Sequence, residues 1–317
     1  SSTNRKVAVI GSGPSGLSCA STLKQAGFDV TVFEKKSVLG GVLKFGIPPY
    51  RLPNQVVDNR IQELMDLGIE FKIEENFGRT RDYISLFNEG YDAMYLAMGA
   101  SKQNFSKIEG SDHAKVIGWK QFLSILNIGE ESFHEHFRHI KRLCVVGGGN
   151  VAMDVSISAA KFGIDTHLLY RRTIDLMPAR KAEIDECLHM GVHVHELVDP
   201  IAVYDQDNYL HVKCKKTKLI KVDEFDRGTI VDDTGYFELD CDLMVMAIGS
   251  SVKKLNFDGL ALDSQGRILV DENYQTNIDR VYAAGDIVSG TKTVIHALSA
   301  GKIAAQSIID RFSKEIK

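Results

Sequence analysis

The feature that most constrains this chain is a strand–turn–helix pattern close to its start. An apolar run, Val7–Ile10, leads into Gly-x-Gly-x-x-Gly at Gly11–Gly16, and a small-residue helical pattern follows directly. In this pattern the first glycine permits a sharp turn, the second lets a ligand approach the backbone, and the third lets the helix lie against the strand. The free N–H groups at such a helix start attract phosphate, so the pattern predicts a nucleotide pyrophosphate at this turn.

The residues after the first helix pattern support that interpretation. Asp29–Phe33 predicts a second strand, and Glu34 follows it immediately. A carboxylate at this position accepts hydrogen bonds from a ribose diol. A glycine-rich turn that only connects strand and helix is the alternative, but the order strand, turn, helix, strand, acid favours dinucleotide binding.

The same pattern occurs a second time. Arg142–Val146 predicts a strand, Gly147–Ala152 has the form Gly-x-Gly-x-x-Ala, and Asp165–Leu169 predicts the second strand of the repeat. Two nucleotide-binding patterns imply two nucleotides.

The two copies differ at the end of the second strand. Counted from the first glycine, the place of Glu34 in the first copy is taken by Tyr170 in the second, and Arg171 and Arg172 follow. An aromatic face with two guanidinium groups suits a 2′-phosphate, and no carboxylate is present to repel it. We therefore expect a nucleotide with a free 2′-hydroxyl in the first site and NADP(H) in the second. The alternative for the two arginines is a solvated surface pair.

Composition excludes several other classes of protein. The 317 residues suffice for about two domains, and a net charge of −4 does not point to nucleic acid. No apolar run approaches the roughly 20 residues that cross a bilayer, and the first residues lack the apolar core of a signal peptide. We expect a cytoplasmic protein with no nucleic-acid or membrane partner, and we leave a homodimer open.

The five cysteines are single and scattered, with no Cys-x-x-Cys. A disulfide reductase needs a dithiol near its flavin, and iron–sulfur clusters need thiolates at short spacing. We therefore disfavour disulfide reduction and expect no metal site. Cys19 and Cys144 lie in nucleotide-fold patterns, where small apolar packing is the expected role.

The segments between the two patterns are predicted in less detail. A loop rich in glycine and proline, 40–53, follows Glu34 and is well placed to wrap a cofactor. Helices are expected over 56–67, 118–126, 181–190 and 292–309, and a polar turn over 127–135. A small antiparallel meander is expected from strands at 192–197, 202–204, 210–214 and 236–239, with turns at 205–208 and 232–235.

Near the end of the sequence, a predicted strand ends in Gly285 and Asp286. These residues offer an N–H and a carboxylate that could hold a polyol chain, and a plain turn is the alternative.

With these motifs in hand, the chain resembles the small subunit of NADPH-dependent glutamate synthase and related FAD/NAD(P)-dependent pyridine nucleotide oxidoreductases, over nearly its whole length. The most specific match is Gly40–Leu52, which is similar to the family's Gly-Gly-x-Leu-x-x-Gly-Ile-Pro segment; Asn150–Asp154 is similar to its second fingerprint. The resemblance implies an α/β fold with two Rossmann-like domains, parallel sheets with helices plus a small antiparallel meander. The second domain is inserted in the first: 1–105 and 273–317 bind FAD, and 106–272 bind NADPH.

The resemblance also implies the binding residues. For FAD they are Gly11, Gly13, Pro14, Ser15, Gly16, Glu34, Lys35, Gly41, Leu43, Gly46, Ile47, Arg51, Gly99, Gly285, Asp286, Thr293, Val294 and His296. For NADPH they are Gly148, Gly149, Asn150, Val151, Arg171, Arg172, Arg180 and Gly249. His296 is the one histidine that we expect at the flavin edge, with helix-end packing as the alternative. No catalytic acid or base is expected, because hydride passes directly between the two cofactors.

One departure from the family concerns the iron–sulfur clusters through which electrons leave the flavin. Members that supply glutamate synthase usually carry an N-terminal cysteine-rich domain with iron–sulfur clusters, whereas this sequence starts just before the first strand. The expected activity is hydride transfer from NADPH to FAD and onward transfer to an iron–sulfur partner, such as a glutamate synthase large subunit, or to a small oxidant. Two alternatives are a ferredoxin–NADP reductase of the thioredoxin-reductase type and a flavin-binding regulatory or scaffold subunit that senses NADPH.

Overall fold

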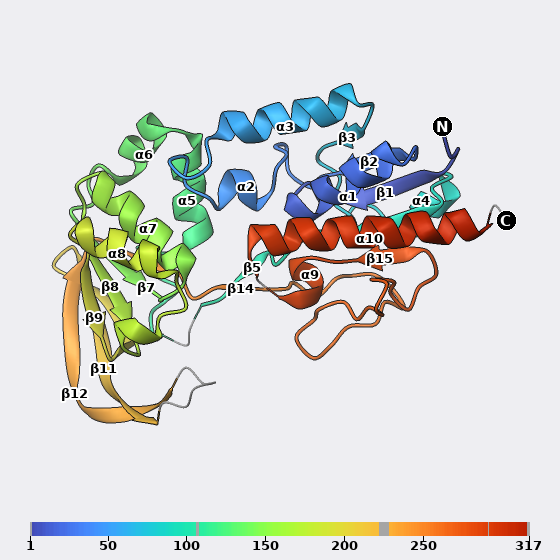
Figure 1. Cartoon of the computed structure of the whole chain (residues 1–317). Coiled ribbons are helices and arrows are strands. Elements are labelled where there is room, and N and C mark those ends of the chain that lie inside the picture. Colours follow the sequence, from blue (N-terminus) through green and yellow to red (C-terminus); the bar gives the residue numbers. More distant parts are fainter. Residues whose placement is uncertain (1, 106–107, 222–227, 291, 316–317) are drawn as a thin grey trace. The chain divides into compact units, whose positions relative to one another are not determined.

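A computed structural model describes residues 2–105, 108–221, 228–290 and 292–315 (Figure 1). The chain divides into two units, each described here by itself. Unit 1 holds the residues up to Phe45, Tyr50–Lys102 and the residues from Ser250 onward; unit 2 holds Gly46–Pro49 and Gln103–Gly249. The return to unit 1 thus comes at residue 250, whereas we expected it at 273. The reason is that Val252, Phe257 and Ile268 contribute to a core of unit 1.

Unit 1 is built on a parallel sheet of five strands in the order β15-β4-β1-β2-β3 (Figure 1). Parallel neighbours need crossover connections, which helices supply. The strands are β1 (Lys6–Ile10), β2 (Asp29–Phe33), β3 (Glu70–Lys72), β4 (Ala93–Leu96) and β15 (Val281–Ala283). The helices are α1 (Pro14–Gln25), α2 (Val42–Phe45), α3 (Asn54–Asp66), α4 (Ser85–Asn88), α9 (Asp286–Ser289) and α10 (Val294–Glu315).

The sheet of unit 1 is buried on both faces. Along β1, Val7 and Val9 join one apolar cluster, and Ala8 and Ile10 join the other. This alternation explains why the strand reads as a continuous apolar run in the sequence. Each fully buried valine or isoleucine side chain contributes about 1.5–3 kcal/mol to folding.

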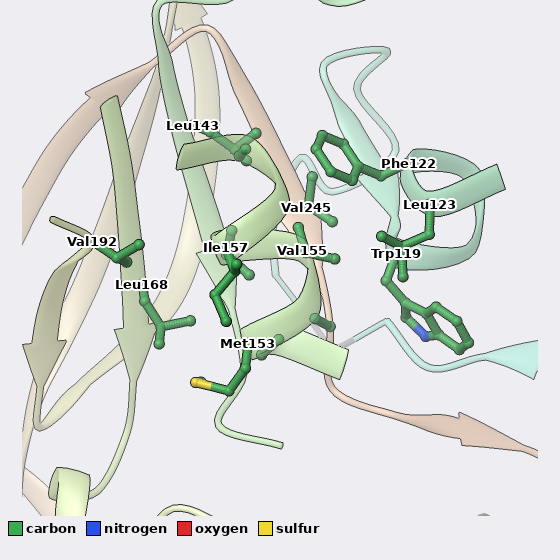
Figure 2. Packing of buried hydrophobic residues seen from close by; sticks show 14 of the residues in the cluster. Trp119, Phe122, Leu123, Leu143, Met153, Val155, Ile157, Leu168, Val192 and Val245 are labelled. Carbon is green, nitrogen blue, oxygen red and sulfur yellow. The ribbon is translucent and has the colours of Figure 1, made fainter. Parts of the chain in front are cut away.

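Unit 2 repeats this architecture with the sheet order β6-β13-β7-β8-β9, again all parallel. The strands are β6 (Val116–Gly118), β7 (Arg142–Val146), β8 (Asp165–Tyr170), β9 (His193–Glu196) and β13 (Leu243–Met246). The helices are α5 (Trp119–Ile128), α6 (Glu130–Phe137), α7 (Asn150–Lys161) and α8 (Lys181–His189), with a 3₁₀ turn at Ile174–Leu176. Figure 2 shows how Val155 and Ile157 of α7 pack among side chains of the sheet, such as Leu143 and Val245.

A three-stranded antiparallel meander belongs to the same unit, formed by β10 (Val198–Gln206), β11 (Tyr209–Lys221) and β12 (Thr229–Cys241). Leu210 and Val212 of β11 share an apolar cluster with Cys144 and Val146 of β7, so the meander covers the second face of the sheet. Where the chain passes between the units, two short strands, β5 (Lys102–Gln103) and β14 (Ser250–Ser251), pair with each other. The α/β fold class with a small antiparallel meander is confirmed.

Three local predictions were wrong. The segment expected as a polar turn over 127–135 contains the start of α6, because Phe133 and Phe137, four residues apart, form an apolar stripe against the Phe122 ring. The strand expected at 192–197 is β9, which pairs with β8 in the parallel sheet and not in the meander.

The turn expected at 232–235 lies within β12. There the register opposite β11 shifts, and Asp233–Gly235 form a bulge rather than a chain reversal. The turn expected at 205–208 is confirmed, since β10 and β11 are joined through Asp207 and Asn208, both with positive φ. Across the described ranges, no helix combines the length and the apolar character of a membrane span.

Candidate functional site

The first glycine turn joins β1 to α1 in unit 1. Gly11 has φ +112°, and a Cβ there would lie 2.4 Å from the Ala97 carbonyl oxygen. A Cβ on Gly16 would lie 1.9 Å from the Gly11 carbonyl oxygen, so both positions exclude a side chain. Gly13 is the N-cap of α1, has no side-chain cap and has nothing within 4 Å of its Cβ position. The helix start, with Pro14 in its first turn, therefore presents free N–H groups to open space.

Glu34 is held beside this turn. Its carboxylate is buried, with a relative exposure of 7% for the residue. Oε2 accepts hydrogen bonds from the Ser12 amide at 3.2 Å and the Ser12 hydroxyl at 2.5 Å, and Oε1 accepts one from the Lys36 amide at 3.0 Å. A carboxylate has about four acceptor positions, so this network orients Glu34 and leaves capacity for a further donor. Ser12 is a residue that we missed, because the fingerprint treats it as variable.

The glycine-rich loop lies on the same turn. Gly41 has φ +54°, and a Cβ there would come within 2.9 Å of Gly13 Cα. The Ser12 hydroxyl accepts a hydrogen bond from the Gly40 amide at 3.1 Å. The loop then forms α2, which includes Leu43, and the Lys36 ammonium lies over the Phe45 ring at 3.8 Å.

The structure also places the other residues predicted for FAD in and around this loop. Lys35 is exposed, the Arg51 guanidinium lies 5.9 Å from the Tyr50 ring, and Gly99 has φ +68° at the end of the β4 segment. Gly46 and Ile47 belong to unit 2, where Asn127 Nδ2 donates to the Ile47 carbonyl at 3.0 Å.

The C-terminal segment of unit 1 also reaches α1. Gly285 has φ +80°, and its Cβ position is 3.0 Å from Ser15. The Ser15 hydroxyl lies 2.5 Å from the Tyr95 hydroxyl, and a Cβ on Gly301 of α10 would be 2.3 Å from the Ser15 carbonyl oxygen. Tyr95 and Gly301 were missed, because nothing local in the sequence connects them to the turn.

The last predicted FAD residues lie around the start of α10. The Asp286 carboxylate accepts from the Lys292 amide at 3.2 Å, and the Thr293 hydroxyl accepts from the His296 amide at 3.2 Å. Val294 is the first residue of α10, and His296 is exposed.

The second glycine turn joins β7 to α7 in unit 2. Gly147 has φ +145°, and a Cβ there would lie 2.3 Å from the Ala247 carbonyl oxygen. Gly149 is the N-cap of α7, has no side-chain cap, and has an open Cβ position like that of Gly13. Asn150 Oδ1 accepts from the Arg180 amide at 2.9 Å, and the Gly148 carbonyl accepts from the Ala179 amide at 3.1 Å. A segment from after β8 therefore lies along this turn.

Tyr170 has a different role from the one expected. Tyr170 is only 8% exposed, and its hydroxyl donates to the Leu176 carbonyl at 3.0 Å. A Cβ on Gly148 would lie 2.4 Å from the Tyr170 ring. The ring thus packs against the glycine turn and is no open face for a phosphate.

The arginines that follow Tyr170 are placed differently. Arg171 is exposed, and its guanidinium has no hydrogen bond or ion pair with a described residue. Arg172 is half-buried, and its Nε donates to the Gly228 carbonyl at 3.1 Å.

Three further residues were predicted for NADPH. Val151 follows Asn150 on α7 and is half-buried. The Arg180 side chain is 69% exposed and lies 3.5 Å from the Glu183 carboxylate. Gly249, with φ +91°, accepts a hydrogen bond from the Asn104 amide at 3.2 Å.

All five cysteines are free and buried. Burial raises the pKa of Cys19 well above its usual value and raises those of Cys187 and Cys214 to about 12. Since the thiolate is the reactive form, no cysteine in this structure is placed as a redox nucleophile.

The comparison with known proteins gives one family whose match includes both glycine turns. The family described as "Pyridine nucleotide-disulphide oxidoreductase" matches residues 5–301. The NADP(+)-dependent formate dehydrogenase subunit beta of Moorella thermoacetica is 37% identical over 96% of this chain and 44% of that protein. The glutamate synthase [NADPH] small chain of Escherichia coli is 32% identical over 97% of this chain and 69% of that protein. The chain thus spans less than half of the first relative and about two thirds of the second.

Solved structures share the fold. FprA of Mycobacterium tuberculosis in complex with NADPH aligns with a TM-score of 0.77 at 19% identity, over 98% of this chain and 84% of that one. Thioredoxin reductase of T. acidophilum aligns with a TM-score of 0.74 at 17% identity, over 99% of this chain and all of that one.

Proposed function

Because the chain belongs to the pyridine nucleotide-disulphide oxidoreductase family, we propose that unit 1 binds FAD, that unit 2 binds NADPH, and that electrons pass from NADPH through FAD to a separate acceptor. Membership of the family makes the chain an oxidoreductase that uses FAD and NADP(H). The family match covers both units. One difference between two otherwise equivalent turns carries the assignment. Unit 1 has Glu34 after its second strand, and unit 2 has Tyr170, Arg171 and Arg172 at the corresponding place.

The first turn fits the pyrophosphate and ribose of FAD. The N-terminus of α1 is uncapped by any side chain and faces open space at Gly13, which suits a diphosphate. The buried Glu34 carboxylate, fixed by Ser12 and Lys36, is preorganised to accept from a ribose hydroxyl. A 2′-phosphate on that ribose would be repelled by Glu34, so the site favours a nucleotide without one.

The second turn fits NADPH. Gly149 leaves the N-terminus of α7 open, as Gly13 does for α1. The exposed guanidinium of Arg171 is available for a phosphate, and Arg172 stands beside it with its Nε held by Gly228. Arginine forks match phosphate geometry, and no acid replaces Glu34 at this position.

The protein's own part in the reaction is binding and orientation. Bound FAD would supply the chemistry of accepting a hydride from a nicotinamide and of onward electron transfer. The residues of the two turns hold the nucleotides by backbone amides, one carboxylate and two guanidinium groups, and none of them needs to transfer a proton. Catalysis therefore comes from positioning.

The electrons must leave to an acceptor outside the described chain. The five buried cysteines provide no accessible dithiol to receive them. Relatives are named as subunits of formate dehydrogenase and glutamate synthase. We propose an iron–sulfur partner protein as the acceptor, with a small oxidant as the other possibility.

Replacement of both arginines tests the assignment of NADPH. Arg171→Ala combined with Arg172→Ala removes two charge-assisted contacts, each worth about 1.5–3 kcal/mol. The affinity for NADPH, measured by fluorescence titration, should fall by about 100-fold or more, while that for NADH should change less than about twofold.

The control is Lys181→Ala. It removes one positive charge close to Arg180 from a side chain that is 89% exposed and paired with Asp185. This variant should retain the preference for NADPH. An equal loss for NADPH and NADH in the double variant would contradict the proposed 2′-phosphate site.

A further inference from the structure

A cluster of one aspartate and three histidines lies in unit 2, apart from the glycine turn. Asp165 and His167 are two residues apart on β8, and His193 and His195 are two residues apart on the edge strand β9. Alternate residues of a strand share one face. Because β8 and β9 pair in parallel with His167 opposite His193, all four side chains lie on the same face.

Three of these side chains converge on one point. Asp165 Oδ1 lies 3.2 Å from His167 Nε2 and 3.5 Å from His193 Nε2, and one ligand atom from each of the three residues lies within 4.8 Å of the others. Tetrahedral coordination with bond lengths of about 2.0–2.2 Å places neighbouring ligand atoms about 3.3–3.6 Å apart. The separation of 3.5 Å between Asp165 and His193 has this spacing, and the separation of 3.2 Å between Asp165 and His167 is just below it.

The surrounding groups hold the three ligand atoms in place. His167 Nδ1 forms a 2.8 Å hydrogen bond with His195 Nε2, so the other ring nitrogen is the one that faces Asp165. Arg142 Nε donates to Asp165 Oδ2 at 2.8 Å, leaving Oδ1 toward the histidines. Histidine ligands in metal sites are oriented in this way by a hydrogen bond to their second nitrogen.

His167 Nε2 provides an independent observation. The residue is 9% exposed, and this buried nitrogen has no hydrogen bond of acceptable geometry with a described residue, although the carboxylate is near. Buried ring nitrogens are normally satisfied. In contrast, the side chains of Asp165 and His193 are 40% and 60% exposed, so the point of convergence is open to solvent on one side.

We propose that Asp165, His167 and His193 bind a divalent transition-metal ion of the Zn²⁺ class, with water completing the coordination. Two imidazoles and one carboxylate suit Zn²⁺, Ni²⁺ or Cu²⁺, whereas Mg²⁺ and Ca²⁺ prefer oxygen ligands alone. The ion would join β8 to the edge strand β9. This proposal departs from our expectation from the sequence that the chain has no metal site, and it does not rest on the nucleotide assignments.

The site is separate from the proposed 2′-phosphate site, because Arg171 comes after the end of β8. His167 precedes Arg171 by four residues, about 13 Å along an extended strand. Metal binding is therefore expected to stabilise unit 2 without competing with NADPH.

Calorimetric titration of tag-free, EDTA-treated protein with ZnCl₂ tests the proposal. We expect one equivalent of Zn²⁺ to bind with a Kd in the micromolar range or tighter and to raise the Tm. His193→Gln and Asp165→Asn should each weaken binding by about 100-fold or more, and His195→Ala, which removes only the orienting hydrogen bond, by about 10–100-fold.

The matched control is His211→Gln. His211 pairs with Asp240 between β11 and β12 and stacks on Tyr204, and no third metal ligand joins this histidine–aspartate pair among the residues that the structure describes. This variant should bind Zn²⁺ like the unaltered protein, and circular dichroism should show that every variant is folded. Absence of stoichiometric binding, equal binding after His193→Gln and Asp165→Asn, or displacement of Zn²⁺ by millimolar Mg²⁺ would each overturn the proposal.

Discussion

The two units contain the same strand, glycine turn and helix, and they differ in what lies against the turn. In unit 1, Glu34 reaches Ser12 with its carboxylate, and Gly41 brings the loop onto Gly13. In unit 2, the Tyr170 ring packs on Gly148, and the Arg180 amide donates to Asn150. In the proposed function, the glycine turn is a common phosphate-binding frame, and residues outside the turn determine which nucleotide each unit favours.

The largest effect is expected at the third glycine position of the fingerprint, where the two units differ. Unit 2 has a buried alanine, Ala152, where unit 1 has Gly16. Gly16→Ala would press a methyl group against the Gly11 carbonyl and should cost about 3 kcal/mol or more, with loss of bound flavin. The ratio of flavin to protein absorbance and the Tm measure both effects.

The reciprocal change is the control. Ala152→Gly should cost only about 1 kcal/mol through helix propensity and should leave the flavin content unchanged. If Gly16→Ala were fully yellow and as stable as the unaltered protein, the close approach of helix and turn in unit 1 would be refuted.

Loss of the acid that distinguishes unit 1 should have the next largest effect. Glu34→Ala removes a charged acceptor, worth about 1.5–3 kcal/mol per contact, and should weaken FAD binding by about 10–150-fold. Reconstitution of the apoprotein with FAD, followed by fluorescence quenching, measures this change.

Ser12→Ala serves as its control. It removes the hydroxyl, which donates to Glu34 and accepts from the Gly40 amide, and it keeps the Glu34 carboxylate and the Ser12 amide bond. It should lower the free energy of unfolding by about 1–3 kcal/mol and leave FAD bound. Undiminished FAD affinity in Glu34→Ala would count against the ribose role.

A smaller effect is expected at the corresponding position of unit 2. Tyr170→Phe removes only the hydrogen bond to the Leu176 carbonyl and should lower the free energy of unfolding by about 0.5–1.5 kcal/mol. The ratio of NADPH to NADH affinity should not change, because the hydroxyl faces the protein. A lower ratio would mean that Tyr170 contacts the 2′-phosphate.

The smallest effect is expected when the native protein is treated with a thiol reagent. Burial raises the pKa of Cys187 and Cys214 to about 12, so their thiolates stay scarce as the pH rises from 7 to 9. An aromatic disulfide reagent should label none of the five cysteines of the native protein and all five after denaturation. Rapid labelling of one native thiol, or useful reduction of thioredoxin or glutathione disulfide, would reopen a disulfide reductase function.

The sequence predicted both glycine turns and their parallel-strand setting because these depend on residues that are close in the chain. It could not predict contacts that depend on distant segments. The Ser15–Tyr95 hydrogen bond and the approach of Gly301 to α1 join residues 80 and more positions apart. The burial of Tyr170 was missed because the pattern of the fingerprint does not show which way a side chain points.

The histidine cluster illustrates the same limit. Asp165 and His167 are neighbours in sequence, but His193 joins them only through the pairing of β8 with β9. Because we assigned the strand that includes His193 to the meander, we had no reason to expect these residues close together. A wrong strand pairing therefore concealed a candidate metal site.

An anaerobic titration of the FAD-loaded protein with NADPH, and separately with NADH, tests the central claim most directly. The account predicts that NADPH bleaches the visible flavin band at one equivalent and that NADH needs a concentration at least about tenfold higher. A flavin band that neither nucleotide bleaches, or that both bleach at equal concentrations, would contradict it.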